Sequence, residues 1–418
     1  MRSNSNVLNR TKKTWIDKCM LLLVIGYYVS LYILANVTWG RFIFLGVALL
    51  MLLLQVVKNR GKLIIRYKSL YGCFFVFAAY TFITSLWAWT PSLAIQKAET
   101  LCELIIVTMI ISNAMDGSIE FDDAMNILLW GGIIVAIYSL KFYGIDGILS
   151  VMAAAGRLDS EFNNVNSLGL CWMLAVVIAF HRLMYKKKYW MIPYIMGLVV
   201  LVAATASRKA LIGMLVGVVL ILFARYRGKT WIATVLQYSI LLIVIILAFS
   251  FLADLPVFSG VRARMDGFTD FFIGKGGIDN QAESRYRYIQ IGIEQWKKTP
   301  IFGIGMANSY TLLASSGERE TYLHNNFVEL LACGGLVGFV IFYMRYFILL
   351  VPGLKSIKKD RNDEKAWLLL VVICMMVLMD YGSVSYTTKV HHLQMVILSL
   401  FLNDRREESN DSYNTMQH

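Results

Sequence analysis

The chain has 418 residues, of which 58% are hydrophobic and 16% are charged. Soluble globular domains carry about a quarter charged residues, so this composition excludes an ordinary water-soluble protein. The formal charge of +13 does not indicate a nucleic-acid partner, because the lysines and arginines lie between apolar runs instead of clustering on one domain.

Apolar runs that approach the roughly 20 residues needed to cross a bilayer recur along the whole chain. They predict an all-α integral membrane protein with about twelve transmembrane helices. The expected spans are 18–36, 42–57, 69–87, 94–112, 125–142, 167–181, 189–206, 209–224, 231–252, 325–350, 366–382 and 387–402.

Basic residues indicate how these spans are oriented. Groups at 58–68, 182–188, 225–229 and 355–365 fall on the side of the N-terminus, which the positive-inside rule places in the cytoplasm. Loop 113–124 has no Lys or Arg, so the fourth and fifth spans are the pair with least support. The predicted organisation is a cytoplasmic N-terminal tail (1–17), spans one to nine (18–252), a large extracytoplasmic loop containing short helices (253–323), spans ten to twelve (324–402) and a cytoplasmic C-terminal tail (403–418).

The large loop contains as many acidic as basic residues, so any anion must be bound by individual side chains and not by a long-range field. One stretch predicts an amphipathic helix that Asn280 or Ser284 could cap, with Arg285 near its N-terminus, where the helix dipole favours an anion. Its apolar residues recur at helical spacing: Tyr286, Ile289, Ile293 and Trp296.

Four polar residues fall on the extracytoplasmic side of this topology: Arg157, Arg208, Arg285 and His324. Three guanidinium forks around one point could hold a pyrophosphate, and histidine is the natural proton acceptor near neutral pH. Each residue taken alone fits an interfacial anchor at least as well. Their location together on one face favours a functional site, but composition and spacing alone leave the function open.

Several common cofactor motifs do not occur in the chain. There is no GxxxxGK[ST] phosphate loop, HExxH, CxxC or DxD motif, so neither an ATP-driven nor a metal-dependent mechanism is expected, and no cofactor is predicted. The pair Gly303 and Gly305 indicates a tight turn. A metal role for the adjacent His391 and His392 is disfavoured.

The segment from His324 to Leu331, followed by Gly335 and Gly338, resembles the signature of the O-antigen ligase and O-antigen polymerase family. That pattern has His-Asn, an aromatic residue two positions after the Asn, a Leu pair, and two glycines three residues apart. The acidic residue that usually precedes the first glycine is replaced by Cys333-Gly334.

Three further stretches are similar to the same family, so that the resemblance extends over about 157–350. They are Arg157 with Asn163 and Asn166, Ser207-Arg208, and Ser284-Arg285 followed by Pro300, Gly303 and Gly305. The resemblance implies an inverting, metal-independent glycosyltransferase whose donor is a glycan on undecaprenyl pyrophosphate. A polymerase of O-antigen or capsular repeat units is the preferred reading. The alternative is a ligase that transfers the glycan to the lipid A core of lipopolysaccharide or to a protein.

The resemblance also assigns roles to residues. Arg208 and Arg285 would bind the donor pyrophosphate with help from Arg157, and His324 would accept the proton of the attacking sugar hydroxyl. Asn163, Asn166 and Asn325 would orient the sugars or the histidine, and Arg287 would contribute to substrate binding.

The implied location is a bacterial cytoplasmic (inner) membrane, with the active site on its extracytoplasmic or periplasmic face. Besides the lipid-linked donor, the glycan acceptor and the bilayer, a chain-length regulator and a flippase of the same cell-envelope pathway are potential partners. A flippase or transporter is the alternative from another class. It is disfavoured because ionisable residues are few in the predicted spans: Lys97, Glu99, Glu103, Glu329, Arg345 and Asp380.

Overall fold

In the computed structural model, the described residues are 14–58, 67–115, 119–154, 156–159, 161–226, 233 and 280–416, and their regular structure is helical. The helices before the large loop are α1 (Trp15–Ile33), α2 (Gly40–Lys58), α3 (Lys68–Ile83), α4 (Pro91–Met115), α5 (Phe121–Tyr143), α6 (Ile145–Ala153), α7 (Val165–Lys186), α8 (Ile192–Ala204) and α9 (Arg208–Tyr226). Within the large loop lie α12 (Asn280–Lys298) and α13 (Ser309–Ser315), and after it come α14 (Asn326–Lys359), α15 (Glu364–Asp380) and α16 (Lys389–Met416).

The predicted all-α membrane architecture is confirmed, but the count of twelve spans is not. Among the described residues, 8 helices are long and apolar enough to cross a membrane, including both helices of the pair with least support, α4 and α5. The segment around α8 is a shorter apolar helix, and α15 has 17 residues. The predicted ninth span, 231–252, lies almost wholly outside the described residues. α16 continues to Met416, through most of the predicted C-terminal tail.

Small residues allow the helices of the bundle to approach closely. A Cβ atom on Gly131 of α5 would lie 2.3 Å from the ring of Tyr28 in α1, and one on Gly132 would lie 2.6 Å from the Cβ of Ala175 in α7. Glycine therefore sets the spacing of three neighbouring helices, as is common in membrane bundles where van der Waals packing drives association. Large apolar side chains remain exposed on the outer faces of α2, α3 and α14, as expected for surfaces that contact lipid.

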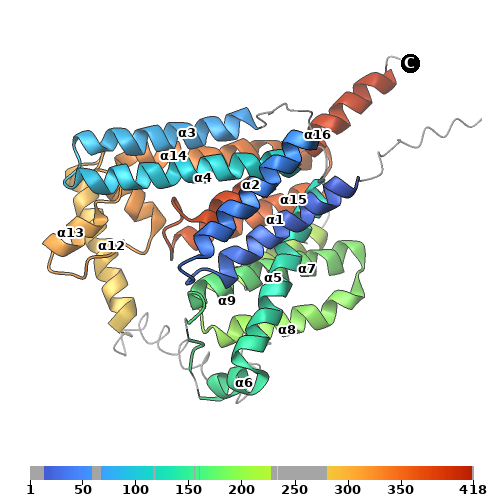
Figure 1. The fold of residues 1–418 in the computed structure, drawn as a ribbon, viewed down its shortest axis with the longest axis horizontal. Helices are drawn as coiled ribbons and strands as arrows, with labels where there is room; N and C mark the ends of the chain where they lie inside the picture. Colours follow the sequence, from blue (N-terminus) through green and yellow to red (C-terminus); the bar gives the residue numbers. More distant parts are fainter. Residues whose placement is uncertain are drawn as a thin grey trace, which may run out of the picture.

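Figure 1 shows α3, α4 and α14 running side by side, with α12 and α13 gathered at one end of this group. α12 packs against α14 through Tyr288 and Val328, together with Leu323 from the segment before α14. The buried side of α12 is centred on Tyr288 and Gly292, whereas Tyr286 is 50% exposed. The amphipathic helix was thus predicted correctly, but Tyr286 does not belong to its buried face.

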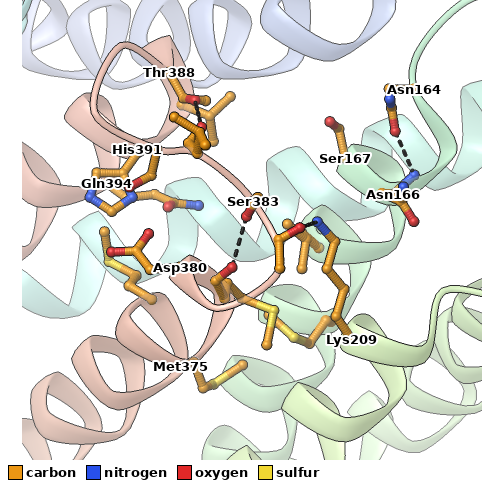
Figure 2. Close-up of a pocket in the computed structure, with 18 of the residues that line it drawn as sticks. Asn164, Asn166, Ser167, Lys209, Met375, Asp380, Ser383, Thr388, His391 and Gln394 are labelled. Carbon is orange, nitrogen blue, oxygen red and sulfur yellow. Dashed lines mark hydrogen bonds between the residues drawn. The ribbon is translucent and has the colours of Figure 1, made fainter. Parts of the chain in front are cut away.

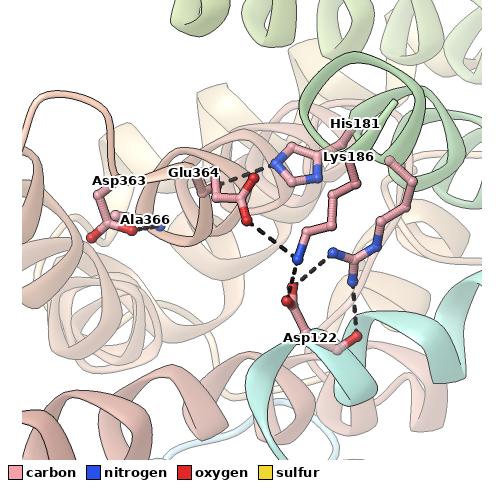
Figure 3. Close-up of polar contacts among 7 residues, drawn as sticks. Asp122, His181, Lys186, Asp363, Glu364 and Ala366 are labelled. Carbon is pink, nitrogen blue, oxygen red and sulfur yellow. Dashed lines mark hydrogen bonds and ion pairs between the residues drawn. The ribbon is translucent and has the colours of Figure 1, made fainter. Parts of the chain in front are cut away.

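A polar cluster ties helix ends together at the other end of the bundle (Figure 3). Asp122, in the first turn of α5, accepts hydrogen bonds from Arg182 through its side chain (2.7 Å) and its backbone carbonyl (2.8 Å). Lys186 pairs with the same carboxylate and with Glu364 at the start of α15 (3.2 Å). Because Arg182 is 2% exposed, its charge depends on this compensation.

We predict that Asp122→Ala destabilises the protein by about 3 kcal/mol, since it leaves a buried guanidinium without its carboxylate. The melting temperature of the purified protein in detergent should fall by several degrees. Asp146→Ala, which removes an exposed carboxylate at the start of α6, is the matched control and should change it little. Equal melting temperatures for the two variants would contradict this role for Asp122.

Candidate active site

A cavity of about 290 Å³ opens where α7 and α9 begin and α15 ends. It lies at the end of the bundle opposite the Asp122 cluster, because α7 ends and α15 begins at that cluster. In Figure 2, Asn164, Asn166 and Ser167 lie on one side, and Asp380, His391 and Gln394 on the other. The polar side chains that line it are Tyr32, Asn164, Asn166, Ser167, Lys209, Arg285, Tyr322, His324, Asp380, Ser383, Ser385, Thr388, His391 and Gln394.

Two cations line the cavity beside His324. Lys209 comes from the first turn of α9, where its Nζ donates to the carbonyl oxygen of Gly382 at 3.1 Å. Arg285 comes from the N-terminal part of α12. Arg157 and Arg285 both lie within electrostatic range of Lys209. Like charges held close together repel, so this arrangement favours binding of an anion that can contact more than one of them.

The ring of His324 is held by neighbours on two sides. Its centroid lies 4.2 Å from that of Tyr322 and 6.2 Å from that of Tyr288 in α12, to which it is nearly parallel. The backbone of His324 is left-handed, with φ of 57°, a conformation that few non-glycine residues adopt and that often marks a constrained functional site.

Buried polar groups fix the chain on either side of His324. The Glu329 carboxylate is fully buried and accepts hydrogen bonds from the Leu323 backbone N–H (2.9 Å) and the Ser309 hydroxyl (2.6 Å). Asn325 caps α14, since its side chain accepts from the Val328 N–H at 3.1 Å. These contacts over-determine the backbone and therefore sustain its strained φ.

The electrostatics of the site keep His324 neutral. Burial lowers the pKa of His324, and the positive charges of Arg285 and Lys209 lower it further, to about 4. At neutral pH the imidazole therefore has a free lone pair with which to accept a proton.

Four of the site residues predicted from the sequence line the cavity or lie near its lysine. Arg285, His324 and Asn166 line the cavity, and Arg157 lies within electrostatic range of Lys209. Arg208 is the first residue of α9 but is not among the lining residues.

Three further predicted residues hold contacts within the protein. Asn163 is buried and donates to the Tyr32 carbonyl oxygen at 2.9 Å. Arg287 pairs with Glu283 and Glu318, each at 2.9 Å. Asn325 is the cap of α14.

Sequence reasoning did not select Lys209, Asp380, His391 or Gln394 as site residues. Lys209 directly follows Arg208, and hydropathy cannot decide which of two adjacent cations at a helix start points inward. Thr388, His391 and Gln394 repeat every three residues in a stretch that also contains Lys389 and His392 and that precedes the apolar run from Met395. This spacing was an available signal for a polar side of that helix.

Gly303, Gly305 and Gly335 lie where segment 300–305 meets a break in α14. Gly335 interrupts that helix with φ of 63°, and segment 300–305 supplies backbone partners at the break. Ile304 and Gly305 donate to the carbonyl oxygens of Ala332 (3.1 Å) and Cys333 (2.9 Å), and the Leu336 N–H donates to the Pro300 carbonyl oxygen (2.8 Å). These bonds satisfy groups that would otherwise be orphaned at a broken helix.

The approach of the two segments leaves no room for larger side chains. A Cβ on Gly335 would lie 2.2 Å from the Ile301 carbonyl oxygen, and one on Gly303 would lie 2.4 Å from that of Cys333. Gly303 and Gly305 both have positive φ, so the tight turn predicted from their sequence is confirmed.

Comparison with known proteins gives two matches. The family model described as O-Antigen ligase matches residues 192–343. The chain is 24% identical over 383 residues to the exopolysaccharide production protein ExoQ of Rhizobium meliloti (strain 1021), which covers 87% of this chain and 83% of that protein. The family match includes α9, α12, Arg285 and His324, and extends through the break in α14.

We predict that Gly335→Ala destabilises the protein, because a side chain at positive φ costs about 1–3 kcal/mol and the added Cβ would also displace the Ile301 backbone. The measurement is the melting temperature, together with the yield of folded protein. The control is Gly46→Ala in α2, where a Cβ meets no atom within 4 Å. A melting temperature for Gly335→Ala equal to that of the control would show that the break does not need glycine.

Proposed function

Because the chain carries an O-antigen ligase family domain over residues 192–343, we propose that it is a membrane glycosyltransferase. It transfers a glycan from undecaprenyl pyrophosphate to a sugar hydroxyl. The observation that carries this proposal is a neutral histidine, His324, beside two cations, Arg285 and Lys209, in one cavity. A proton acceptor next to an anion site is what transfer from a lipid pyrophosphate requires.

The proposed step is a single displacement at the anomeric carbon of the donor. The acceptor oxygen forms a bond to that carbon while the bond from carbon to pyrophosphate oxygen breaks, which inverts the configuration. The bonding pair leaves with undecaprenyl pyrophosphate, and the proton of the acceptor hydroxyl moves to His324. The reaction needs neither ATP nor a metal, because the lipid pyrophosphate is already an activated leaving group.

Arg285 and Lys209 stabilise the charge that develops on the leaving group. The guanidinium of Arg285 can contact two phosphate oxygens at once, and Lys209 adds a compact charge from the start of α9. Arg157 adds a third charge near Lys209. Arg208 is retained as a pyrophosphate ligand on its family resemblance. Contacts that strengthen as the pyrophosphate leaves lower the barrier and do not merely tighten binding.

The same cations link donor binding to the basicity of His324. They lower the pKa of the free histidine, and an anionic pyrophosphate between them offsets their effect. The histidine therefore becomes a stronger base when the donor is in place. Asn166 lies on the cavity wall, where it can orient a sugar. We propose that Asn163, Arg287 and Asn325 stabilise the site through the contacts that their side chains make within the protein.

Among transferases of this kind we favour a polymerase, which adds the glycan to the next lipid-linked repeat unit. The 24% identical relative is named for exopolysaccharide production, and an exopolysaccharide grows by joining repeat units. The alternative acceptor, the lipid A core, is suggested by the description of the family model. The proposed location is the bacterial inner membrane with the cavity facing outward, as the grouping of basic residues favours.

We predict that purified protein extends lipid-linked repeat units isolated from its own strain, and that His324→Ala and Arg285→Ala reduce this activity at least about 100-fold. Arg285→Lys should restore only part of it, since the charge is kept and the bidentate fork is lost. Arg319→Ala, which removes a cation of the large loop that does not line the cavity, is the control. Near-normal transfer by folded His324→Ala protein would refute the assignment of the base.

The products separate the possible functions. A polymerase yields longer chains on the undecaprenyl carrier, whereas a ligase yields glycan on lipid A core and no elongation. Movement of the lipid-linked glycan across proteoliposomes without any transfer would indicate a flippase and contradict the proposal.

We also predict a shift in pH dependence when Lys209 is replaced by Met. Protonation of His324 should abolish its role as base, so the acid limb of kcat/KM reports its pKa in the free protein, about 4. Because the Lys209 charge lowers this pKa, its removal raises it, and the acid limb should move to higher pH. For the wild type, the acid limb of the kcat profile should lie at higher pH than that of kcat/KM, because the bound donor raises the pKa of His324. An acid limb that stays in place in Lys209→Met would contradict the electrostatic coupling.

A further inference from the structure

One wall of the cavity has no role in the reaction as described above. Thr388 immediately precedes α16, and His391 and Gln394 lie in its first two turns. Their spacing of three residues puts them on one side of the helix start, and all three line the cavity. Asp380, the last residue of α15, lies beside them (Figure 2). The cations Lys209 and Arg285 belong to other helices, so this wall has a different chemical character.

Gln394 contributes a side-chain amide to this wall of the cavity. Its side chain is 7% exposed and forms no hydrogen bond with the part of the chain that the structure describes. The carboxamide of Asn166, on the opposite side of the cavity in Figure 2, also makes no hydrogen bond within the described ranges. Neither side-chain amide is used in a contact among the described residues, so a ligand in the cavity can form hydrogen bonds with both groups.

His391 is held as a neutral hydrogen-bond donor. Its Nε2 lies 2.9 Å from Nη2 of Arg345 and 3.0 Å from the Tyr346 hydroxyl. A guanidinium can only donate, so Nε2 accepts and the ring proton resides on Nδ1. No residue in the described part of the chain accepts a hydrogen bond from that Nδ1, and His391 lines the cavity. Arg345 is thus a positioning residue that fixes the tautomer of His391.

Asp380 supplies the complementary acceptor. One oxygen of its carboxylate accepts from the Tyr343 hydroxyl at 2.9 Å and from the Asn326 amide at 3.4 Å, which fixes the orientation of the group. The wall therefore presents a donor on His391, an acceptor on Asp380, and both a donor and an acceptor on Gln394.

We propose that Asp380, His391 and Gln394, with Asn166 opposite, form a subsite for one neutral sugar ring. Each sugar hydroxyl both donates and accepts, which matches amide, imidazole and carboxylate groups arranged around a small space. The cavity of about 290 Å³ is slightly smaller than the ~300–1,000 Å³ typical of ligand pockets, so it suits a single ring better than an oligosaccharide. This inference rests on the proposed function, in which a sugar lies next to the pyrophosphate.

The ring can come from the donor or from the acceptor, because both sugars meet at the site of reaction and share this chemistry. Steady-state transfer kinetics with Gln394→Ala and with Gln394→Met, which nearly keeps the side-chain volume, distinguish the two. We expect a rise of at least ten-fold in KM for one substrate and a smaller change in kcat. A rise for the acceptor assigns the subsite to the attacking sugar, and a rise for the donor assigns it to the sugar on the pyrophosphate.

A binding measurement makes the test independent of transfer. The probe is the free repeat-unit oligosaccharide released from the strain's own polysaccharide, without lipid or pyrophosphate, and saturation-transfer NMR detects its binding to protein in detergent. We expect binding to the wild type and to Gln290→Ala, which changes an exposed amide on α12, and at least ten-fold weaker binding to Gln394→Ala and Gln394→Met. Arg285→Ala should lose transfer but still bind the oligosaccharide.

The outcomes separate this inference from the proposed function. If the wild-type protein transfers no glycan but binds the oligosaccharide, and the Gln394 variants bind it at least ten-fold more weakly, the subsite is supported and the transferase is overturned. Active transfer with unchanged KM values, and equal oligosaccharide binding, in folded Gln394→Met protein would overturn the subsite and leave the transferase in place. Melting temperatures equal to that of Gln290→Ala verify that the Gln394 variants are folded.

Discussion

The contact between segment 300–305 and the broken helix α14 determines where the candidate catalytic groups lie. Backbone groups of α14 that lose their helical partners at Gly335 are bonded by Ile304, Gly305 and Pro300 instead. This contact joins the end of α12 to the bundle, and α12 carries Arg285. The same packing brings Tyr288 against His324. The described part of the large loop, 280–323, thereby becomes a fixed element of the site.

Tyr80 extends this constraint to the N-terminal half of the chain. Its hydroxyl donates to the Gly334 carbonyl oxygen at 2.6 Å, and a Cβ on Gly338 would lie 2.8 Å from its ring. The second glycine of the motif thus makes room for a side chain of α3, and the Gly334 carbonyl that the break leaves open is satisfied. Both glycines of the motif have a packing explanation that requires no contact with substrate.

The rigid packing around the cavity holds positively charged side chains close together although they repel each other. Lys209 and Arg285 line one cavity beside a histidine that burial and their charges keep neutral. Buried contacts of Glu329 and the cap at Asn325 hold the backbone on either side of this histidine. A bound anion relieves the repulsion, so the proposed donor would stabilise the site while it activates the base.

The sequence predicted what depends on local pattern and missed what depends on packing between distant segments. Helices α4 and α5 follow from apolar length and lie within a few residues of the expected spans. Arg285 and His324 followed from family resemblance, and both line the cavity. The buried face of α12 depends on how closely Gly292 approaches Val328 and Leu323, so the sequence could not identify Tyr288 in place of Tyr286. The inward direction of Lys209 and the polar side of α16 are likewise set by neighbours far away in the chain.

The pKa of His324 with and without undecaprenyl pyrophosphate shows whether the donor anion binds beside the proposed base. The chain has only five histidines, so NMR of protein labelled at histidine can resolve the ring, and a His324→Gln variant assigns its signal. The electrostatic coupling between Arg285, Lys209 and His324 predicts a pKa of about 4 for His324 in the free protein and a clear rise when the lipid pyrophosphate binds. A pKa that stays the same with saturating lipid would contradict the claim that the donor anion lies between Arg285 and Lys209, next to the base.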